Sequence, residues 1–111
     1  MPKLSEISEK IGLNSKFLCE DVNIKNGYCC DLLSEVMGKA KEGSIWVTVH
    51  NNMNVVAVAS MLDLKAVIIT EGHKANDEFL KKAKEESISV FETNKDSFDV
   101  VGKLFELGIK G

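Results

Sequence analysis

Three short runs of β-branched and apolar residues, spaced almost evenly, constrain the fold most. Residues 45–49, 66–70 and 88–91 begin 21 and 22 positions apart, and each leads into a polar turn and then a helical pattern. Strands buried on both faces stay apolar throughout, whereas half-exposed strands alternate with polar residues. The intervals hold one helix each, the connection that a parallel pair requires. We predict an α/β fold, a three-layer sandwich with a mainly parallel sheet built from successive βα units.

Apolar residues at helical spacing predict helices around and between these strands. A first helix over residues 4–11 ends at Gly12, a typical left-handed C-cap. A second spans residues 31–40, with Asp31 as the candidate N-cap. Residues 55–59 have strand propensity, but the parallel crossover requires a helix there.

Two further helices and one short strand complete the prediction. The helices span residues 77–86 and 97–107, and the strand spans residues 17–19. In the last helix four apolar residues are expected to face inward: Phe98, Val101, Leu104 and Phe105.

The charge composition limits the partners. The chain has 111 residues and a net charge of −3, and all 14 of its cationic residues are Lys. Arg supplies the bidentate fork that grips guanine edges and phosphates, so its absence, with the acidic balance, argues against nucleic acid. No signal-like or membrane-spanning run is visible, which predicts a single cytoplasmic domain over residues 1–111 without a membrane partner.

The three cysteines do not indicate a disulfide framework or a metal site. Cys19, Cys29 and Cys30 are odd in number, and two are adjacent in the chain. No C-x-x-C spacing exists, and we expect a core or strand role, with no metal and no cofactor. A reducing compartment fits this pattern.

Polar residues gather where the three apolar strands end. Ligands of open parallel sheets bind beyond the carboxyl ends of the strands, where helix N-termini expose backbone N–H groups. We call the residues that directly follow each strand a strand exit. If the three strand exits are neighbours, they form one polar cleft suited to a small anionic or nucleotide-like ligand. The alternative is that these residues only cap helices and close turns. The candidate ligand-binding residues are Thr48, His50, Asn51, Thr70, Gly72, His73, Lys74 and Thr93.

Catalytic machinery is not recognisable. Residues 38–44 have the glycine spacing of a phosphate-binding loop. They lack Lys-Ser or Lys-Thr after the second glycine, and Ser44 and Ile45 follow a helix and open a strand, whereas such a loop leads from a strand into a helix. His50 or His73 could act as a general base, but the sequence shows no Ser or Cys nucleophile in a recognisable catalytic turn. No enzymatic activity is predicted.

Two segments carry a family resemblance. Residues 27–37, GYCCDLLSEVM, and residues 40–48, AKEGSIWVT, resemble the DRTGG domain family. Residues 54–59 and 68–72 are similar to it as well, so the resemblance covers nearly the whole chain. The arginine and paired glycines that name the family are not kept, because residues 21–27 retain only Asp21 and Gly27.

The resemblance implies a three-layer α/β domain similar to the N-terminal domain of HPr kinase/phosphorylase. It also implies a regulatory or dimer-forming module, which accompanies CBS domains in some pyrophosphatases. We therefore expect a non-enzymatic, ligand-sensing homodimer with its ligand at the strand exits. The alternative is a structural or protein-interaction domain whose apolar segment 55–61 contributes to an oligomer interface.

Overall fold

The computed structural model describes residues 1–111 and contains one five-stranded sheet with five helices. The strand order is β1-β5-β4-β3-β2, in which β2 to β5 run parallel and β1 pairs antiparallel with β5. The elements are α1 (Leu4–Ile11), β1 (Asn14–Phe17), β2 (Gly27–Cys29), α2 (Leu33–Lys39), β3 (Ile45–Thr48), α3 (Met53–Met61), β4 (Ala66–Ile69), α4 (Asp77–Glu85), β5 (Ser89–Glu92) and α5 (Ser97–Glu106). The predicted α/β class and the mainly parallel sheet are confirmed.

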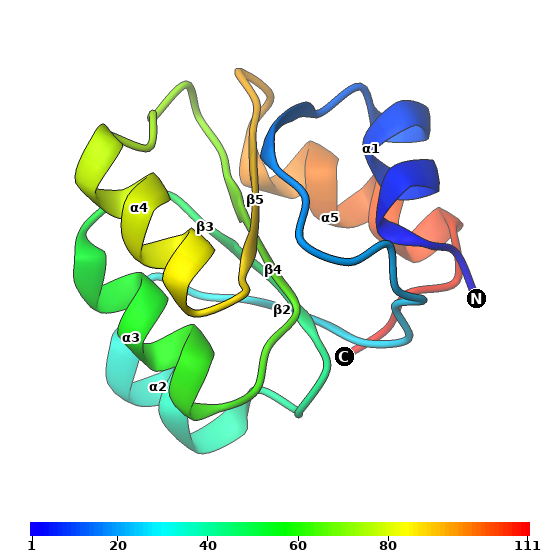
Figure 1. Ribbon diagram of the computed structural model, residues 1–111. Coiled ribbons are helices and arrows are strands. Elements are labelled where there is room, and N and C mark those ends of the chain that lie inside the picture. The colour runs from blue at the N-terminus through cyan, green and yellow to red at the C-terminus, as the bar shows by residue number, and fades with distance from the viewer.

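Helices cover both faces of the sheet. Helices α2, α3 and α4 lie on one side of the strands, and α1 and α5 lie on the other (Figure 1). Successive residues of each central strand therefore enter different cores: Trp46 and Val67 pack towards α3, whereas Val47 and Ile68 pack towards α1 and α5. Both faces being covered explains why these strands are apolar throughout.

Helix α3 forms despite the strand propensity of its sequence. Its valines Val55, Val56 and Val58 are buried against the sheet, as a crossover helix requires. The expectation that this segment forms an oligomer interface is wrong for these residues, because their side chains belong to the core. The large apolar residues of α3 that lie outside are Met53 and Met61, which are 41% and 68% exposed.

The N-terminal half differs from expectation in three places. The first strand is β1, which overlaps the predicted residues 17–19 only at Phe17 and has a bulge between Ser15 and Phe17. Strand β2 is not predicted, because it is only three residues long and none of them is buried. Asp31 does not cap α2, whose N-cap is Leu32, because its carboxylate binds the end of β3 instead.

Helix α5 turns a different side to the core than its apolar spacing predicts. Val100 and Leu104 are buried, whereas Phe98 is 91% exposed and Phe105 is 61% exposed. The prediction that Phe98, Val101 and Phe105 face inward is wrong. Two apolar stripes share this helix, and the one that fits against the sheet contains Val100 and Leu104.

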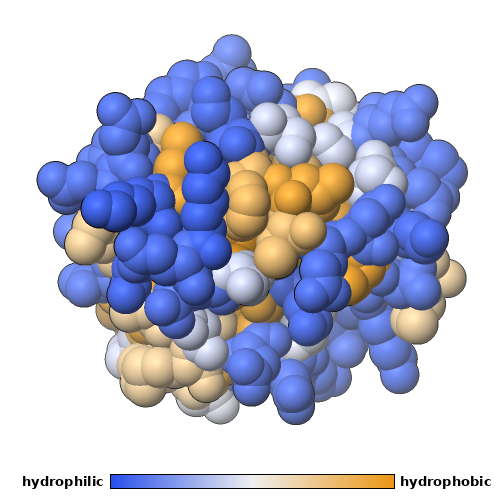
Figure 2. All heavy atoms as spheres, in the orientation of Figure 1, coloured by the Kyte–Doolittle hydropathy of each residue, from blue (hydrophilic) through white to orange (hydrophobic).

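Helix α4 has one buried side and one charged, exposed side. Phe79 and Ala83 are buried, and Lys81 and Lys84 are exposed. Figure 2 shows hydrophilic side chains over much of this face, with an apolar area near the middle and a paler one at the lower left. No helix of the chain is long and apolar enough to cross a membrane.

Candidate functional site

The exits of β3, β4 and β5 lie side by side at one edge of the sheet. Thr48 pairs with Ile69, and Ile69 pairs with Glu92 across the parallel ladder. The following residues continue this contact, because Thr70 N–H donates to Thr48 O and Thr93 N–H donates to Ile69 O, both at 3.0 Å. The structure therefore brings the three predicted exits together.

The three threonine hydroxyls at these exits are used within the chain. Thr48 Oγ1 donates to Asp31 at 2.8 Å, which also accepts the Val49 N–H. Thr70 Oγ1 lies 2.6 Å from Ser97 Oγ, and Thr70 is fully buried. Thr48 and Thr70 thus tie distant segments to the sheet and offer no hydroxyl to a ligand in this conformation.

The helix N-termini at this edge are also occupied by groups of the chain. Asn52, Asn76 and Asp96 cap α3, α4 and α5 with their side-chain oxygens. The Glu71 carboxylate accepts the Ser97 N–H at 2.8 Å. The expected set of free backbone donors is therefore largely satisfied internally, because side-chain oxygens already take the positions that an anion would occupy.

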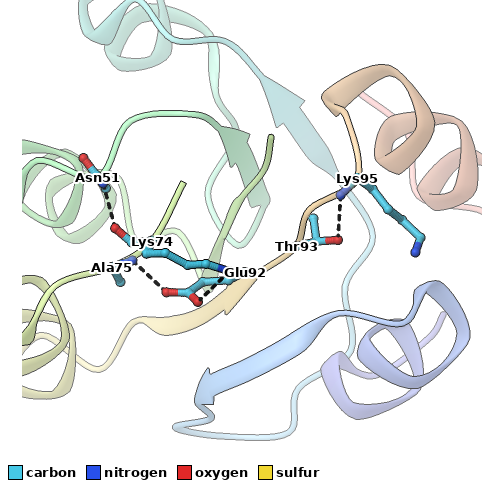
Figure 3. A network of polar contacts seen from close by, with 6 residues as sticks. All are labelled: Asn51, Lys74, Ala75, Glu92, Thr93 and Lys95. Atoms are coloured by element: carbon cyan, nitrogen blue, oxygen red, sulfur yellow. Dashed lines mark hydrogen bonds and ion pairs between the residues drawn. The ribbon is translucent and has the colours of Figure 1, made fainter. Parts of the chain in front are cut away.

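One polar cleft remains open beside these contacts, and we call it the exit cleft. Its volume is about 230 Å³, and it lies between the end of β5 and the start of β1. The residues that line it are Gly12, Asn14, Lys74, Glu92, Thr93, Asn94 and Lys95. Lys74 and Lys95 lie on either side of Thr93 (Figure 3). Of the predicted residues, Lys74 and Thr93 line the cleft.

A buried carboxylate fixes one wall of the exit cleft. Glu92 is 2% exposed, accepts the Ala75 N–H at 2.7 Å and lies 4.0 Å from Lys74 Nζ. A buried carboxylate is tolerated when it is hydrogen-bonded and close to a cation. Glu92 therefore holds the start of α4 against β5 and draws Lys74 towards itself.

Lys95 is the cation of the exit cleft that remains free. It forms no ion pair, and its Nζ lies 3.9 Å from where a Cβ on Gly12 would stand. Its backbone N–H donates to Thr93 Oγ1, which fixes the loop that carries it (Figure 3). The N–H groups of Lys74 and Asn94 have no partner within the chain. The cleft thus contains an unpaired ammonium, and two of its lining residues have free backbone N–H groups; donors of these kinds bind phosphate or carboxylate oxygens.

The other predicted residues surround the exit cleft without lining it. Asn51 donates its side-chain N–H to Lys74 O at 2.7 Å, and Gly72 N–H donates to Thr93 O at 3.1 Å. Both contacts position the loops of the cleft. His50 and His73 are exposed, and their backbone N–H groups bind the Thr48 hydroxyl and the Thr70 carbonyl.

Five residues of the cleft were absent from the predicted set at the strand exits: Gly12, Asn14, Glu92, Asn94 and Lys95. Glu92 follows Val90 by two positions and shares its side of the strand. A carboxylate on an inward-facing position of an apolar strand is a signal that could have identified it. Asn14 and Gly12 enter because β1 pairs with β5, a contact that the mispositioned first strand did not predict.

The cysteines lie away from the exit cleft. Cys19 and Cys29 are exposed, so the core role is wrong for these two, although Cys29 does lie in β2. Cys30 is partly buried and packs against the core between the sheet and α3. Partial burial, with smaller contributions from Asp31 and Cys30, raises the pKa of the Cys29 thiol. No three His, Cys, Asp or Glu side chains are placed to hold a metal ion.

Comparison with known proteins identifies a family and a similar fold. The family model described as the DRTGG domain matches residues 15–107. A solved structure of the CBS and DRTGG domains of the regulatory region of Clostridium perfringens pyrophosphatase, complexed with activator, diadenosine tetraphosphate, is similar with a TM-score of 0.77 and 20% identity. That match covers 91% of this chain and 45% of the other. No curated protein matches the sequence.

Proposed function

The chain belongs to the DRTGG domain family, and from this premise we propose that it is a non-enzymatic regulatory module that senses a small anionic or nucleotide-like ligand. The regulatory role is supported by the similar structure, which is part of the regulatory region of a pyrophosphatase. We place the ligand at the carboxyl ends of the strands, in the exit cleft. The HPr kinase resemblance, the single domain over residues 1–111 and a cytoplasmic location stay predictions.

The observation that carries this proposal is the unpaired cation in the exit cleft. Lys95 forms no ion pair, and the neighbouring N–H groups of Lys74 and Asn94 are free. Hydrogen bonds between an ammonium and a phosphate oxygen are stronger than neutral ones. The Glu92 carboxylate already lies next to Lys74 and would repel a phosphate bound there. We therefore expect the cleft to bind a single anionic group, close to Lys95.

A nucleotide is the ligand class that we favour within this chemistry. The similar structure is complexed with diadenosine tetraphosphate, a nucleotide activator. The exit cleft of about 230 Å³ is too small to enclose a whole nucleotide, since ligand pockets are typically about 300–1,000 Å³. We therefore expect the cleft to hold a phosphate group while the rest of the ligand extends across the surface.

A thermal-shift screen tests the ligand proposal. The probes are diadenosine tetraphosphate, ATP, AMP, acetyl phosphate and a sugar phosphate. A ligand at about 100 times its Kd stabilises the fold by about 2.7 kcal/mol, which raises the unfolding midpoint by roughly 10 °C. No shift with any probe would refute ligand binding.

Two charge-matched variants show whether the shift comes from the exit cleft. Lys95→Gln removes the free ammonium and leaves the backbone contact to Thr93 intact. Lys25→Gln removes one exposed lysine close to the opposite end of the sheet, near the start of β2. We expect Lys95→Gln to reduce the shift and Lys25→Gln to preserve it. Equal effects of the two variants would place the ligand elsewhere.

A dimer is the assembly that we propose, and a protein-interaction domain without a small ligand is the alternative function. The alternative is favoured by the exposed apolar side chains of α5, Phe98 and Phe105. A chain that shows no thermal shift but forms a stable oligomer would support it.

A further inference from the structure

Helix α5 carries an apolar stripe on its exposed side. Phe98, Val101 and Phe105 follow one another at steps of three and four positions, and they are 91%, 37% and 61% exposed. Residues three and four apart lie on the same side of a helix. The three side chains therefore form one continuous surface, which we call the α5 stripe.

A groove lies directly beside the α5 stripe. Its volume is about 240 Å³, and Val101 and Phe105 share its lining with Tyr28, Cys29 and Ile109. Strand β2 is an edge strand, and α5 leaves the groove open next to it. This volume falls below the roughly 300–1,000 Å³ of small-molecule pockets. Its size and apolar lining suit an inserted side chain better than a metabolite.

The α5 stripe can pair with a copy of itself. Phe98 and Phe105 are equally far, in sequence, from the midpoint between Val101 and Gly102. In an antiparallel pair of α5 helices related by a two-fold axis at this midpoint, Phe98 of each copy meets Phe105 of the other. Such an interface is isologous, and the contact between Phe98 and Phe105 is made twice. Because Phe105 lines the groove, Phe98 of the second copy reaches its mouth.

The centre of α5 permits close approach of a second helix. Gly102 lies mid-helix, and a Cβ built on it would meet no atom of the chain within 4 Å. Glycine inside a helix destabilises it by roughly 0.5–1 kcal/mol relative to Ala. The absence of a side chain at this position lets two backbones approach at the proposed axis.

The charges of α5 are complementary in the antiparallel arrangement. Asp96 and Asp99 lie at its start, and Lys110 follows its end. Lys103 pairs with Asp99 of the same helix at 3.9 Å, and Glu106 is the last helical residue, so Lys110 is the cation that this end offers to a second copy. Lys110 Nζ lies 5.3 Å from the centre of the Phe105 ring, at the groove. Antiparallel pairing brings the acidic start of α5 in one copy towards Lys110 of the other, and opposite ends of the helix dipoles meet as well.

We propose that two copies of this chain associate through the α5 stripe, antiparallel about a two-fold axis near Gly102, with Phe98 of each copy at the groove of the other. This inference rests on the dimer of the proposed function and names its surface. The occupant of the groove is therefore a second copy of the chain. If the tests below show no self-association, the dimer is refuted, and a small ligand in the groove or a different protein on the stripe would be the remaining occupants.

Sedimentation velocity on the full chain tests the surface. Across roughly 1–500 µM we expect a reversible monomer–dimer equilibrium in the unmodified chain. Phe98→Asp should weaken the dimer roughly tenfold or more, because a central aromatic residue of an interface carries much of its affinity. The substituted residue is almost fully exposed and lies in the first turn of α5, so the fold is retained.

A matched pair of glycine variants adds a control. Gly102→Gln adds a side chain at the proposed axis, and Gly38→Gln adds the same side chain to α2, where a Cβ also meets no atom. We expect only Gly102→Gln to weaken the dimer. A chain that stays monomeric throughout the concentration range, or a dimer that survives both Phe98→Asp and Gly102→Gln, would overturn the proposal.

Cross-linking tests the two-fold axis itself. A residue near the axis faces its own copy, and a disulfide needs Cα atoms about 4.4–6.8 Å apart. In a background where the three native cysteines are Ser, Gly102→Cys should form a disulfide dimer under mild oxidation much faster than Gly38→Cys. Equal rates would overturn the proposed axis. Neither readout involves the exit cleft, so the dimer surface and the ligand proposal can fail independently.

Discussion

The hydroxyl contact between β4 and α5 gives the sharpest prediction about the strand exits. Thr70 Oγ1 lies 2.6 Å from Ser97 Oγ, and Thr70 itself is fully buried. The variant Thr70→Val has nearly the same shape and removes only the hydroxyl. It isolates this hydrogen bond at a residue that the strand pattern assigns to ligand binding.

The expected loss follows from the surroundings of the two hydroxyls. A hydrogen bond within the chain contributes a net of about 0.5–1.5 kcal/mol to the free energy of unfolding. Ser97 is only partly buried, so its hydroxyl can turn to water after the substitution and adds no further cost. The 3.5 Å contact from Thr70 Oγ1 to Thr48 O is too long to add much. We expect Thr70→Val to lower the free energy of unfolding by about 1 kcal/mol and the melting midpoint by roughly 4 °C.

A double-mutant cycle measures the contact. Urea unfolding followed by circular dichroism gives the free energies of Thr70→Val, Ser97→Ala and the double variant. The two single effects should overlap, with a coupling energy of about 0.5–1.5 kcal/mol. Ligand affinity should not change in Thr70→Val. A coupling energy near zero, or a tenfold loss of ligand affinity, would refute the assignment of this hydroxyl to the interior.

Three further predictions concern the core and the ionisable groups. Phe79→Ala should lower the free energy of unfolding by about 3–5 kcal/mol, because Phe79 is fully buried; a loss below about 1 kcal/mol in urea unfolding would contradict the packing. Asp31→Asn removes a charge that raises the pKa of the Cys29 thiol, so the pKa should fall and alkylation of Cys29 near pH 8, measured by mass spectrometry, should become faster. An unchanged rate would mean that the Asp31 charge does not act on this thiol. Hydrogen bonds from Ser5 hold the pKa of Asp21 below its ordinary value of 3.8, so its stabilising effect is present above that value and is lost as the pH falls through the folded-state pKa. The melting midpoints of Asp21→Asn and the unmodified chain should therefore converge in acid, and a constant gap would contradict this sign.

The sheet could be predicted from the sequence because its central strands are buried on both faces. Every residue of β3, β4 and β5 is buried and most of them are apolar, and the intervals between the strands hold a helix each. The same reasoning identified α3 as a helix against its own propensity, since tertiary connection outweighs local preference. Strand β2 could not be identified in this way, because its three residues are only partly buried.

Helix α5 shows where periodicity reaches its limit. Its sequence contains two apolar stripes, and spacing alone does not say which of them meets the sheet. The structure buries Val100 and Leu104 and leaves Phe98 and Phe105 exposed. Assigning Phe98 and Phe105 to the inward side of α5 hides the exposed surface through which we propose that two copies associate.

The strand exits were predictable as neighbours, but their chemistry was not. Parallel order places Thr48, Thr70 and Thr93 at one edge. Asp31 and Ser97, which engage the first two hydroxyls, come from segments 17 and 27 positions away in the sequence. Contacts of this range follow from tertiary packing, so the sequence pattern could not separate structural from ligand-binding threonines.

An NMR titration tests the central claim, an anion held in the exit cleft, most directly. Diadenosine tetraphosphate is added to the ¹⁵N-labelled chain, and the amide shifts are followed in the unmodified protein and in Lys95→Gln. We predict saturable shifts centred on the free amides of Lys74 and Asn94, with weaker binding in the variant. Shifts confined to another part of the surface, or saturation with unchanged affinity in Lys95→Gln, would contradict the claim.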